Sequence, residues 1–336
     1  MRILICSPEE NPATGNWVTG LRYKNGLERF SHQVKLCALS GADGALKSLV
    51  EQFRPDLLLL LHAFRSGRQW LSGEWKPIPA LVMLSGTDIN EGLNDPVQQP
   101  IIEQVLQRAD GVLIQNALLA QQLRQQHPAL SVRLHELPPA IELGNRTYSL
   151  RGRHGLPENA VLFLCPASIR PVKGVLALIE LFDQLRPDPS RWRVAFCGPE
   201  LDSAYSHHFL AAVDRRPWIH YLGVIPPDGM ASAMGEADVI VNNSVSEGLP
   251  NALIEAACLG RPILASDIPG NQPIVHHGQN GLLFHDCASF STAARQLIAS
   301  AALRQQLSRP EPDRFSPARE AEALQRICLR ICGPDP

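Results

Sequence analysis

A run of five leucines, Leu57–Leu61, restricts the fold of this 336-residue chain more than any other feature. A strand that is apolar on both faces must be covered on both sides, which is typical of the interior of parallel sheets. The run is far too short for a membrane-spanning helix, which needs about 20 apolar residues. The sequence therefore predicts a buried strand over residues 56–61 in an α/β domain.

Segments typical of strands and of helices alternate around this run. Further strands are predicted at residues 3–7, 33–39, 80–84 and 111–114, and helices at 16–30, 45–53, 100–108 and 117–126. Short connections between alternating strands and helices favour a parallel, doubly wound sheet. The dinucleotide-binding pattern G-x-G-x-x-G does not occur, which disfavours a dehydrogenase.

A second pattern of the same kind follows a break. Pro138-Pro139 and the polar segment 145–159 interrupt the alternation, and we interpret the segment as a linker between domains. Beyond it, strands are predicted at residues 161–165, 193–197, 219–222, 238–242 and 263–266, and helices at 175–185, 204–213, 230–235, 252–259, 288–307 and 318–332. We expect doubly wound domains over residues 1–145 and 146–312, and a helix within 313–336 that packs back on the first domain.

Composition and charge exclude several classes of protein. With 45% hydrophobic and 19% charged residues and a formal net charge of −2, the chain offers no electrostatic reason to bind nucleic acid or an anionic membrane. It lacks the pattern of a signal peptide and of a transmembrane helix, so we expect a cytoplasmic protein. None of the eight cysteines forms a C-x-x-C pair, which favours reduced thiols over zinc ligands or disulfides.

The stretch from Ser244 to Phe284 holds the strongest functional signal. Glu247 and Glu255 stand eight positions apart, with Gly-Leu-Pro-Asn between them and an apolar helical run after it. The amides and dipole at a helix N-terminus favour phosphate. We therefore expect a site that binds a phosphate and hydrogen-bonds hydroxyl groups on both sides of it.

Two cations follow a predicted strand earlier in the same domain. Arg170 and Lys173 come after the strand at 161–165, and Lys173 precedes a helix. Taken alone, such residues are usually solvated surface charges. In one domain with Glu247 and Glu255, they favour a diphosphate ligand instead.

Polar residues also follow strands in the first domain. Gly15 and Asn16 lie where a ligand could approach backbone amides, although Asn16 could simply cap a helix. His62 ends the leucine strand and could be a core histidine or a functional one, with function favoured by its position and by Arg65 nearby. Asp88 could cap a helix or face a ligand, and the sequence leaves both alternatives open.

These motifs resemble those of a known family. Glu-Gly-Leu-Pro-Asn at 247–251, with the second Glu at 255 and Ala-Ser-Asp-Ile-Pro-Gly-Asn downstream, is similar to the Glu-x7-Glu signature of retaining family-4 glycosyltransferases. That family has the GT-B fold, in which two Rossmann-like domains face each other across a cleft. Gly15-Asn16-Trp17, His62-Ala63-x-Arg65-Ser66 and Arg170-Pro-Val-Lys173 are also similar to segments of bacterial selenosugar synthases.

The resemblance implies a role for each residue. Arg170 and Lys173 would hold the donor diphosphate, Glu255 the ribose hydroxyls, and Glu247 the transferred sugar. The catalytic set would be Glu247, His62, Lys173 and Arg170; donor binding would add Gly15, Asn16, Val224, Ile225, Gly248, Leu249, Pro250, Asn251 and Glu255; and the acceptor side would hold Trp17, Arg65 and Asp88. In the family the Arg stands five residues before the Lys, a position that Ser168 occupies here.

The expected activity is transfer of a hexose or N-acetylglucosamine from a UDP-sugar to a small acceptor. The chain has no D-x-D pair of the kind that binds a divalent ion in other glycosyltransferases, so we expect no metal and no further cofactor. The alternatives are a selenosugar synthase that couples UDP-N-acetylglucosamine to selenophosphate or a sulfur analogue, a UDP-sugar epimerase, and a non-catalytic nucleotide-sugar sensor.

Overall fold

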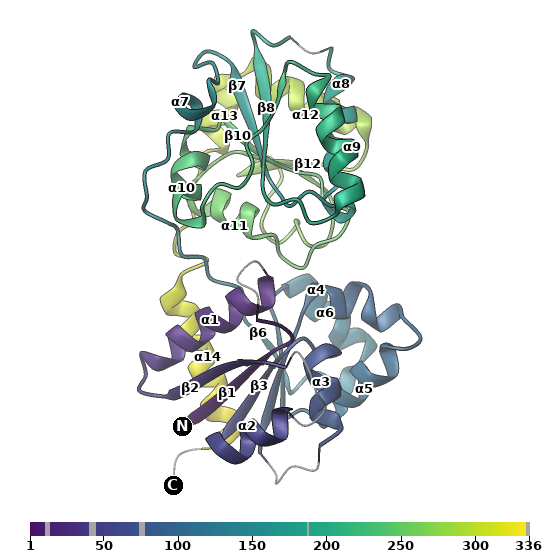
Figure 1. Cartoon of the computed structure of the whole chain (residues 1–336), viewed down its shortest axis with the longest axis vertical. Coiled ribbons are helices and arrows are strands. Elements are labelled where there is room, and N and C mark those ends of the chain that lie inside the picture. Colours follow the sequence, from purple (N-terminus) through teal and green to yellow (C-terminus); the bar gives the residue numbers. More distant parts are fainter. Residues whose placement is uncertain (11–13, 40–44, 74–77, 187, 334–336) are drawn as a thin grey trace. The chain divides into compact units, whose positions relative to one another are not determined.

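The computed structural model describes residues 1–10, 14–39, 45–73, 78–186 and 188–333, and it contains two compact units (Figure 1). One unit comprises Met1–Ala140 and Ser316–Pro336, and the other comprises Ile141–Phe315. The chain thus crosses between the units twice, after Ala140 and after Phe315, where the sequence interpretation placed borders at residues 145 and 312.

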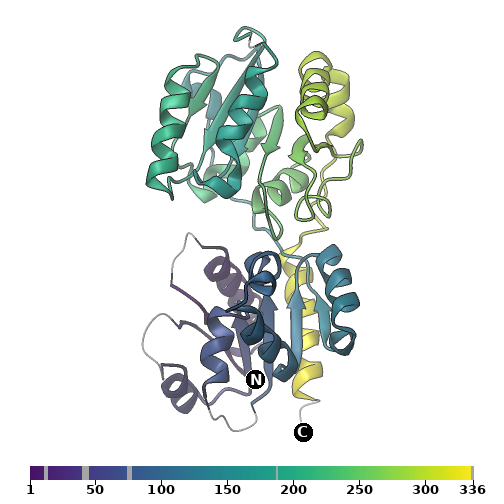
Figure 2. The ribbon, with the colours of Figure 1, turned by 90° about the vertical axis from the view of Figure 1, so that its right-hand side faces the viewer.

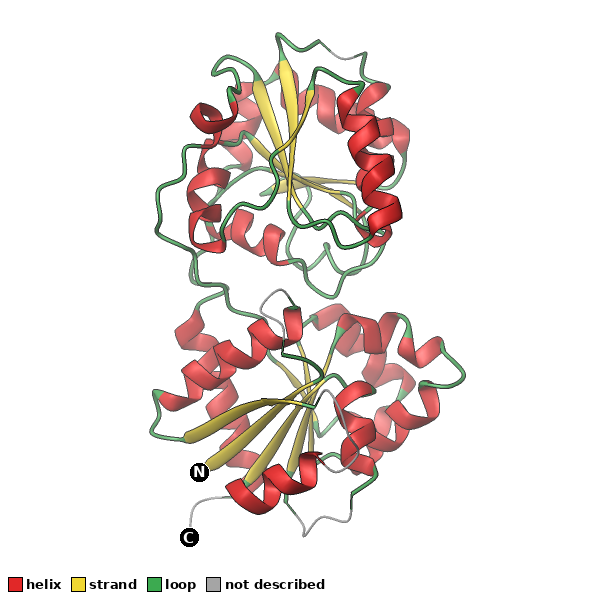
Figure 3. Ribbon diagram, in the orientation of Figure 1, coloured by secondary structure: helices red, strands yellow, loops and turns green. Residues whose placement is uncertain are grey.

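The first unit is built on a parallel sheet, which is drawn as yellow strands in Figure 3. Its six strands lie in the order β2-β1-β3-β4-β5-β6. Its strands are β1 (Arg2–Ser7), β2 (Gln33–Ala38), β3 (Leu57–Leu61), β4 (Ala80–Leu84), β5 (Gly111–Ile114) and β6 (Leu134–Glu136). Its α-helices are α1 (Gly15–Glu28), α2 (Ala45–Phe53), α3 (Arg65–Leu71), α4 (Gly86–Asn90), α5 (Gln99–Arg108), α6 (Ala117–Gln126) and α14 (Pro317–Cys332).

The leucine run forms β3, an interior strand of this sheet, and it is buried on both faces as predicted. All five side chains of β3 are fully buried. Leu58 and Leu60 face a core shared with α2, α3, α5 and α6, whereas the other three leucines face a core shared with α1 and α14. Helices therefore cover both faces of the sheet, which is why the strand carries no polar side chain.

The second unit repeats this architecture with the strand order β12-β11-β10-β7-β8-β9 (Figure 2). Its strands are β7 (Val161–Pro166), β8 (Trp192–Cys197), β9 (Ile219–Tyr221), β10 (Val239–Asn242), β11 (Ile263–Ser266) and β12 (Gly281–Phe284). Its α-helices are α7 (Leu150–His154), α8 (Val175–Asp183), α9 (Ser203–Asp214), α10 (Pro227–Glu236), α11 (Asn251–Cys258), α12 (Cys287–Ala299) and α13 (Ala301–Leu307). One face of the sheet packs on α8, α9, α12 and α13, and the other on α7, α10 and α11.

Each sheet has one point where the direction of strand addition reverses. In the second unit the chain runs from β7 to β8 and β9 on one side, and from β10 to β11 and β12 on the other. In the first unit the reversal lies between β1 and β3. Ligands of open α/β sheets bind outside the carboxyl ends of the strands at such points. The loops that follow β7 and β10, and those that follow β1 and β3, therefore mark the candidate sites.

Two sequence predictions about the second unit are wrong. The segment 145–159 is not a free linker, because it contains α7 and belongs to the second unit. The reason is Arg151, which is buried and whose guanidinium reaches Asp238 Oδ2 at 2.8 Å and the carbonyl of Glu236 at 3.1 Å. The predicted helix 288–307 is two helices, since the Ser300 side chain caps α13 by accepting a hydrogen bond from the amide of Leu303.

The terminal helix α14 is part of the first unit and packs against α1. Arg22 of α1 donates two hydrogen bonds to the carboxylate of Glu320, at 2.6 and 3.0 Å, and Glu320 also accepts one from the amide of Ala140. Gly26 of α1 leaves room for Ala321, because a Cβ at position 26 would lie 2.9 Å from that side chain. In the described part of the chain, no helix has both the length and the apolar character that a membrane span requires.

Candidate active site

The switch point of the second sheet is occupied by an ion pair. Lys173 ends a short 3-10 turn after β7, and Glu247 lies in the loop after β10. Lys173 Nζ lies 2.5 Å from Glu247 Oε1, and the two side chains are 16% and 11% exposed. The two loops approach closely because Gly174 (φ +59°) separates Lys173 from α8, and a Cβ there would lie 2.3 Å from the carbonyl oxygen of Asn243.

The carboxylate of Glu247 is held by more than Lys173. Ser244, which is almost fully buried, donates a hydrogen bond of 2.6 Å from Oγ to the same Oε1 atom. The amide of Val245 donates to the carbonyl of Val172, which fastens the loop after β10 to the loop after β7. Hydrogen bonds that involve a charged group are the stronger ones, so the orientation of this carboxylate is well defined.

Helix α11 begins four residues after Glu247 and presents an uncapped N-terminus. Pro250 occupies the N-cap position and provides no side-chain hydrogen bond to the first turn. The amides of a first helical turn have no partners within the helix, and they carry the positive end of the dipole. Asn251 is exposed, and Gly248 and Leu249 are half-buried. The predicted segment 248–251 is therefore the loop and first residue of a helix suited to an anion.

Glu255 lies one turn into α11 and stands alone. Its carboxylate makes no hydrogen bond or ion pair with any residue that the structure describes. Burial raises its pKa to about 7. Its charge also contributes to raising the pKa of the buried thiol of Cys197, which ends β8. Glu255 thus offers unused acceptor atoms beside the carboxyl end of the sheet.

The remaining predicted donor residues differ in accessibility. Arg170 is exposed, and within the described residues its guanidinium has no hydrogen-bond or ion-pair partner. Val224, in the turn after β9, is 62% exposed. Ile225 is buried in the core that packs on α10 and α11, so only its backbone could reach a ligand. The position of Ile225 near the base stays a prediction.

The first sheet carries a second polar pair at its own switch point. His62 follows β3, and its Nδ1 lies 2.7 Å from Oδ1 of Asp88, with both side chains buried. The Thr87 hydroxyl lies 3.2 Å from His62 Nε2. His62 has a φ of +79°, which is unusual for a residue with a side chain and is found most often at functional sites. The structure therefore places His62 in a constrained, oriented position.

Asp88 is the residue that holds this arrangement together. It accepts hydrogen bonds from the amides of Ala63, Phe64 and Ser85, at 2.9 to 3.1 Å, and forms a capping box with Ser85 at the start of α4. Burial alone raises the pKa of Asp88, but the hydrogen bonds and the charge of His62 outweigh it and hold the pKa below its usual range. Ser85, not Asp88, is the N-cap, and the fully buried carboxylate of Asp88 contacts His62.

The other predicted residues of the first unit lie at the start of α1 and α3. Helix α1 begins at Gly15 with Thr14 as N-cap, so Asn16 is not the cap. Asn16 and Trp17 are half-buried. Arg65 of α3 is paired with Glu9 at 2.5 Å, which the sequence interpretation did not foresee. Its charge is therefore already balanced.

Three buried residues around Glu247 were also missed. Asn242, Ser244 and Asn271 form a hydrogen-bonded set behind the carboxylate. Ser244 and Asn271 lie inside the Ser-Val-Ser-Glu and Ile-Pro-Gly-Asn motifs, and buried polar side chains at strand ends are the signal that could have identified them.

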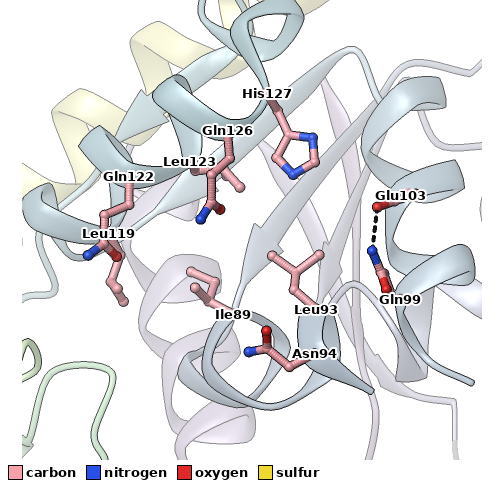
Figure 4. A pocket seen from close by; sticks show the side chains of 10 residues that line it. All are labelled: Ile89, Leu93, Asn94, Gln99, Glu103, Leu119, Gln122, Leu123, Gln126 and His127. Carbon is pink, nitrogen blue, oxygen red and sulfur yellow. Dashed lines mark hydrogen bonds between the residues drawn. The ribbon is translucent and has the colours of Figure 1, made fainter. Parts of the chain in front are cut away.

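A hollow of about 480 Å³ lies elsewhere on the first unit, between α4, α5 and α6 (Figure 4). Its lining combines leucines with amides such as Gln122 and Gln126, and it includes Glu103 and His127. None of the predicted site residues lines it. Within the described residues, no group of three or more His, Cys, Asp or Glu side chains could hold a metal ion.

Two doubly wound parallel sheets, in units connected by two chain crossings, define the GT-B class of glycosyltransferase folds. Solved structures agree: a sucrose-phosphate synthase from Thermosynechococcus elongatus superposes with a TM-score of 0.84 at 16% identity, covering 98% of each chain. Anabaena HepE in complex with UDP and glucose gives a TM-score of 0.81 at 15% identity, covering 98% of this chain and 100% of that one.

Sequence comparison agrees with this fold. The model of the family "Glycosyl transferases group 1" matches residues 159–300, so the second unit carries a group 1 glycosyltransferase domain. Glycosyltransferase 1 domain-containing protein 1 of Xenopus tropicalis is 26% identical over 308 residues, covering 88% of this chain and 87% of its own length. D-inositol 3-phosphate glycosyltransferase of a Nocardioides species is 26% identical over 227 residues, which cover 61% of this chain and half of that protein.

Proposed function

We propose that the protein is a retaining glycosyltransferase that transfers a hexose or N-acetylglucosamine from a UDP-sugar to a small acceptor without a metal ion. The observation that carries this proposal is the pairing of Lys173 with Glu247 at the switch point of the second sheet, four residues before the uncapped helix α11. A cation, a helix N-terminus and two carboxylates are the groups that a nucleotide diphosphate sugar requires.

The diphosphate would bind to the cationic part of this site. Lys173 contacts Glu247, which lies four residues before the first residue of α11. Arg170 is exposed, and its guanidinium has no hydrogen-bond or ion-pair partner among the described residues. A diphosphate carries more negative charge than the carboxylate of Glu247, so it competes effectively for the lysine. Ser244 would then remain as the hydrogen-bond partner of Glu247 Oε1.

The two glutamates would bind different hydroxyl groups. Glu255, which has unused acceptor atoms, suits the two adjacent hydroxyls of a ribose. Glu247, whose Oε1 is held by Lys173 and Ser244, would position the transferred sugar. The different surroundings of the two carboxylates support different roles: Glu255 would bind the nucleotide, and Glu247 would bind the transferred sugar.

Leaving-group stabilisation would provide most of the catalysis. The departing diphosphate gains negative charge as the glycosidic bond breaks, and preorganised cations and amides stabilise that charge. Glu247 is a poor candidate nucleophile because its Oε1 accepts a short hydrogen bond from Ser244, which lowers the nucleophilicity of that oxygen. We therefore favour attack by the acceptor on the face that the leaving group vacates, with the leaving phosphate accepting the acceptor's proton. His62, oriented by Asp88, stays a predicted member of the catalytic set.

Calorimetric titration with UDP and with UDP-sugars is the direct test. Wild-type protein is expected to bind UDP and to release UDP slowly from a UDP-sugar without an acceptor, and this release should be lost in Glu247→Ala. Addition of a chelator should leave both properties unchanged. A folded protein that binds no UDP would overturn the proposal. Recovery of an epimerised UDP-sugar instead of UDP would show an epimerase, and binding without any turnover would show a sensor.

An anionic selenium or sulfur acceptor, such as selenophosphate, is the second candidate. It is favoured by the N-terminus of α1, where Thr14 provides no side-chain cap and Gly15 is exposed at the carboxyl end of β1. Arg65, paired with Glu9, would contribute less than its sequence position indicated. Mass spectrometry of a reaction with UDP-N-acetylglucosamine and selenophosphate decides this version, because the absence of a selenosugar rejects it.

A further inference from the structure

The turn 267–271, which follows β11, packs directly against Glu247. At Gly270 an added Cβ would lie 2.5 Å from the carbonyl oxygen of Glu247 and 2.6 Å from its Cβ. No side chain larger than hydrogen fits at such distances. The Ile-Pro-Gly-Asn motif of this turn therefore packs against the backbone and Cβ of Glu247. The donor contacts proposed above do not include this packing role.

The last residue of this turn, Asn271, is fully buried and has a fixed orientation. Its Nδ2 lies 2.9 Å from the carbonyl oxygen of Ser266, 3.2 Å from Ser266 Oγ and 3.2 Å from Asn242 Oδ1. All three atoms accept hydrogen bonds, because Ser266 Oγ donates its own hydrogen to the carbonyl of Ser244. The amide of Asn271 must therefore point its NH2 group toward Asn242.

Asn242 extends this arrangement to the candidate active site. Its Oδ1 accepts from the amide of Ser244 at 3.0 Å, and its Nδ2 donates to Ser244 Oγ at 3.2 Å. Since Ser244 Oγ accepts from Asn242, its hydroxyl hydrogen is free to point at Glu247 Oε1, 2.6 Å away. A continuous path of directed hydrogen bonds thus runs from Asn271 through Asn242 and Ser244 to Glu247.

Stability alone does not account for this buried amide. The Oδ1 atom of Asn271 is buried and has no hydrogen-bond partner. An unmet buried acceptor destabilises the folded state, and a smaller apolar residue at this position would not incur this penalty. Buried polar networks can instead specify one arrangement of the groups they contact.

We propose that Asn271 is a positioning residue, which acts through Asn242 and Ser244 to hold the Glu247 carboxylate in the orientation that receives the donor sugar. This inference rests on the proposed function. During turnover a bound diphosphate would engage Lys173, and the hydrogen bond from Ser244 would continue to orient Glu247 Oε1.

Asn280 provides a matched control in the same unit. It is also buried and also fixes a turn, since its Oδ1 accepts from the amide of His276 at 2.8 Å and its Nδ2 donates to the carbonyl of Ile274 at 3.0 Å. None of its hydrogen bonds leads to Glu247. Asn271→Ser and Asn280→Ser should therefore lower the melting temperature similarly. Only Asn271→Ser should disturb the positioning of the donor sugar by Glu247.

The experiment compares wild type, Asn271→Ser and Asn280→Ser by melting temperature, by UDP affinity and by kcat and KM for UDP release from a UDP-sugar. We expect both variants to bind UDP as wild type does, because the proposed contacts of UDP are with Lys173, Arg170 and Glu255 rather than with Glu247. Asn271→Ser should lower kcat by about 10- to 100-fold, the range for losing one hydrogen bond that orients a functional group. Asn280→Ser should keep kcat within about twofold of wild type.

Asn271→Asp adds a readout that a structural role would not produce. An aspartate can donate to Asn242 Oδ1 only when it is protonated, so kcat of this variant should rise as pH falls. Equal kcat for the folded Asn271→Ser and Asn280→Ser proteins, or a pH profile of Asn271→Asp that parallels wild type, would overturn the inference. If the wild type itself neither binds UDP nor releases it, the proposed function fails, and that result is distinct from an active wild type with equal variants.

Discussion

Nζ of Lys173 lies 2.5 Å from Oε1 of Glu247, and this ion pair joins the loops at the carboxyl ends of two neighbouring strands, β7 and β10. These strands belong to opposite halves of the sheet in sequence, so the pair exists only because the sheet reverses its direction between them. Both side chains are mostly buried, which makes each charge dependent on the other.

The ion pair can be tested by a double-mutant cycle. Lys173→Met or Glu247→Gln alone leaves a mostly buried charge without its partner, and we expect each to cost about 2–3 kcal/mol of unfolding free energy. The double variant should cost less than the sum of the two. Urea denaturation measures all four proteins, and strict additivity would contradict a mutually dependent pair. Lys173→Met should also lower kcat for UDP release by about 100-fold or more.

The raised pKa of Glu255 predicts opposite effects on stability and on binding. Burial raises this pKa from 4.5 to about 7, so the folded protein holds the proton more tightly than the unfolded chain does. Its contribution to stability is therefore most favourable below pH 4.5 and declines as pH rises toward 7. Glu255→Gln should be more stable than wild type above pH 7, by about 1–2 kcal/mol after allowance for partial exposure.

The same substitution, Glu255→Gln, should weaken the binding of UDP. A glutamine can accept from one ribose hydroxyl but lacks the charge, and we expect about a tenfold loss of affinity at pH 8. Thermal melts at pH 5 and pH 8.5, together with calorimetric titration of UDP, measure both effects. A variant that is less stable than wild type at pH 8.5 would contradict an unpartnered, buried carboxylate.

Arg170 should contribute to binding without contributing to stability. Its exposed guanidinium has no partner within the described residues, so Arg170→Ala should change the unfolding free energy by no more than about 0.5 kcal/mol. UDP affinity should fall about 5- to 30-fold, and the loss should shrink at high salt. Arg215→Ala, at the exposed end of α9, is the control and should bind UDP as wild type does. Equal affinities for the two variants would remove Arg170 from the diphosphate site.

Asp88 should stabilise the folded protein and fix the orientation of the His62 side chain. Asp88→Ala removes the acceptor of three backbone amides and of His62, and we expect a loss of about 3 kcal/mol or more of unfolding free energy. The lowered pKa means that the stabilisation by Asp88 is complete above about pH 3.8 and is lost as pH falls below it. Denaturant titrations at pH 3 and pH 6 should therefore show a smaller difference between Asp88→Asn and wild type at the lower pH.

His62 itself can be tested separately from its support. Because its φ is +79°, His62→Asn is the suitable substitution, since asparagine tolerates this backbone conformation better than alanine does. The variant should remain folded and bind UDP, while kcat falls about 10- to 100-fold. An unchanged kcat would remove His62 from the active site and leave it as a core residue.

Much of the fold could be predicted because its strands are nearly pure apolar runs. Leu57–Leu61 allowed only a strand covered on both faces, and the strand at 161–165 was identified in the same way. The short strands β6 and β12 and the helices α3, α4 and α7 were missed because tertiary packing, not local pattern, stabilises elements this short. Segment 145–159 looked like a linker because its polarity gave no sign that Arg151 is buried against Asp238.

For the candidate site, the sequence by itself determined the residue types and their places at the ends of strands: Lys173 after β7, and Glu247 and Glu255 around the start of α11. Spacing along the chain is sufficient for this, because strand ends and helix starts are local features. Only the tertiary structure decided the partnerships. Glu247 meets Lys173, Asp88 faces His62, and Asn271 supports Ser244 because strands distant in sequence become neighbours, and hydrogen bonds depend on positions within a few tenths of an ångström.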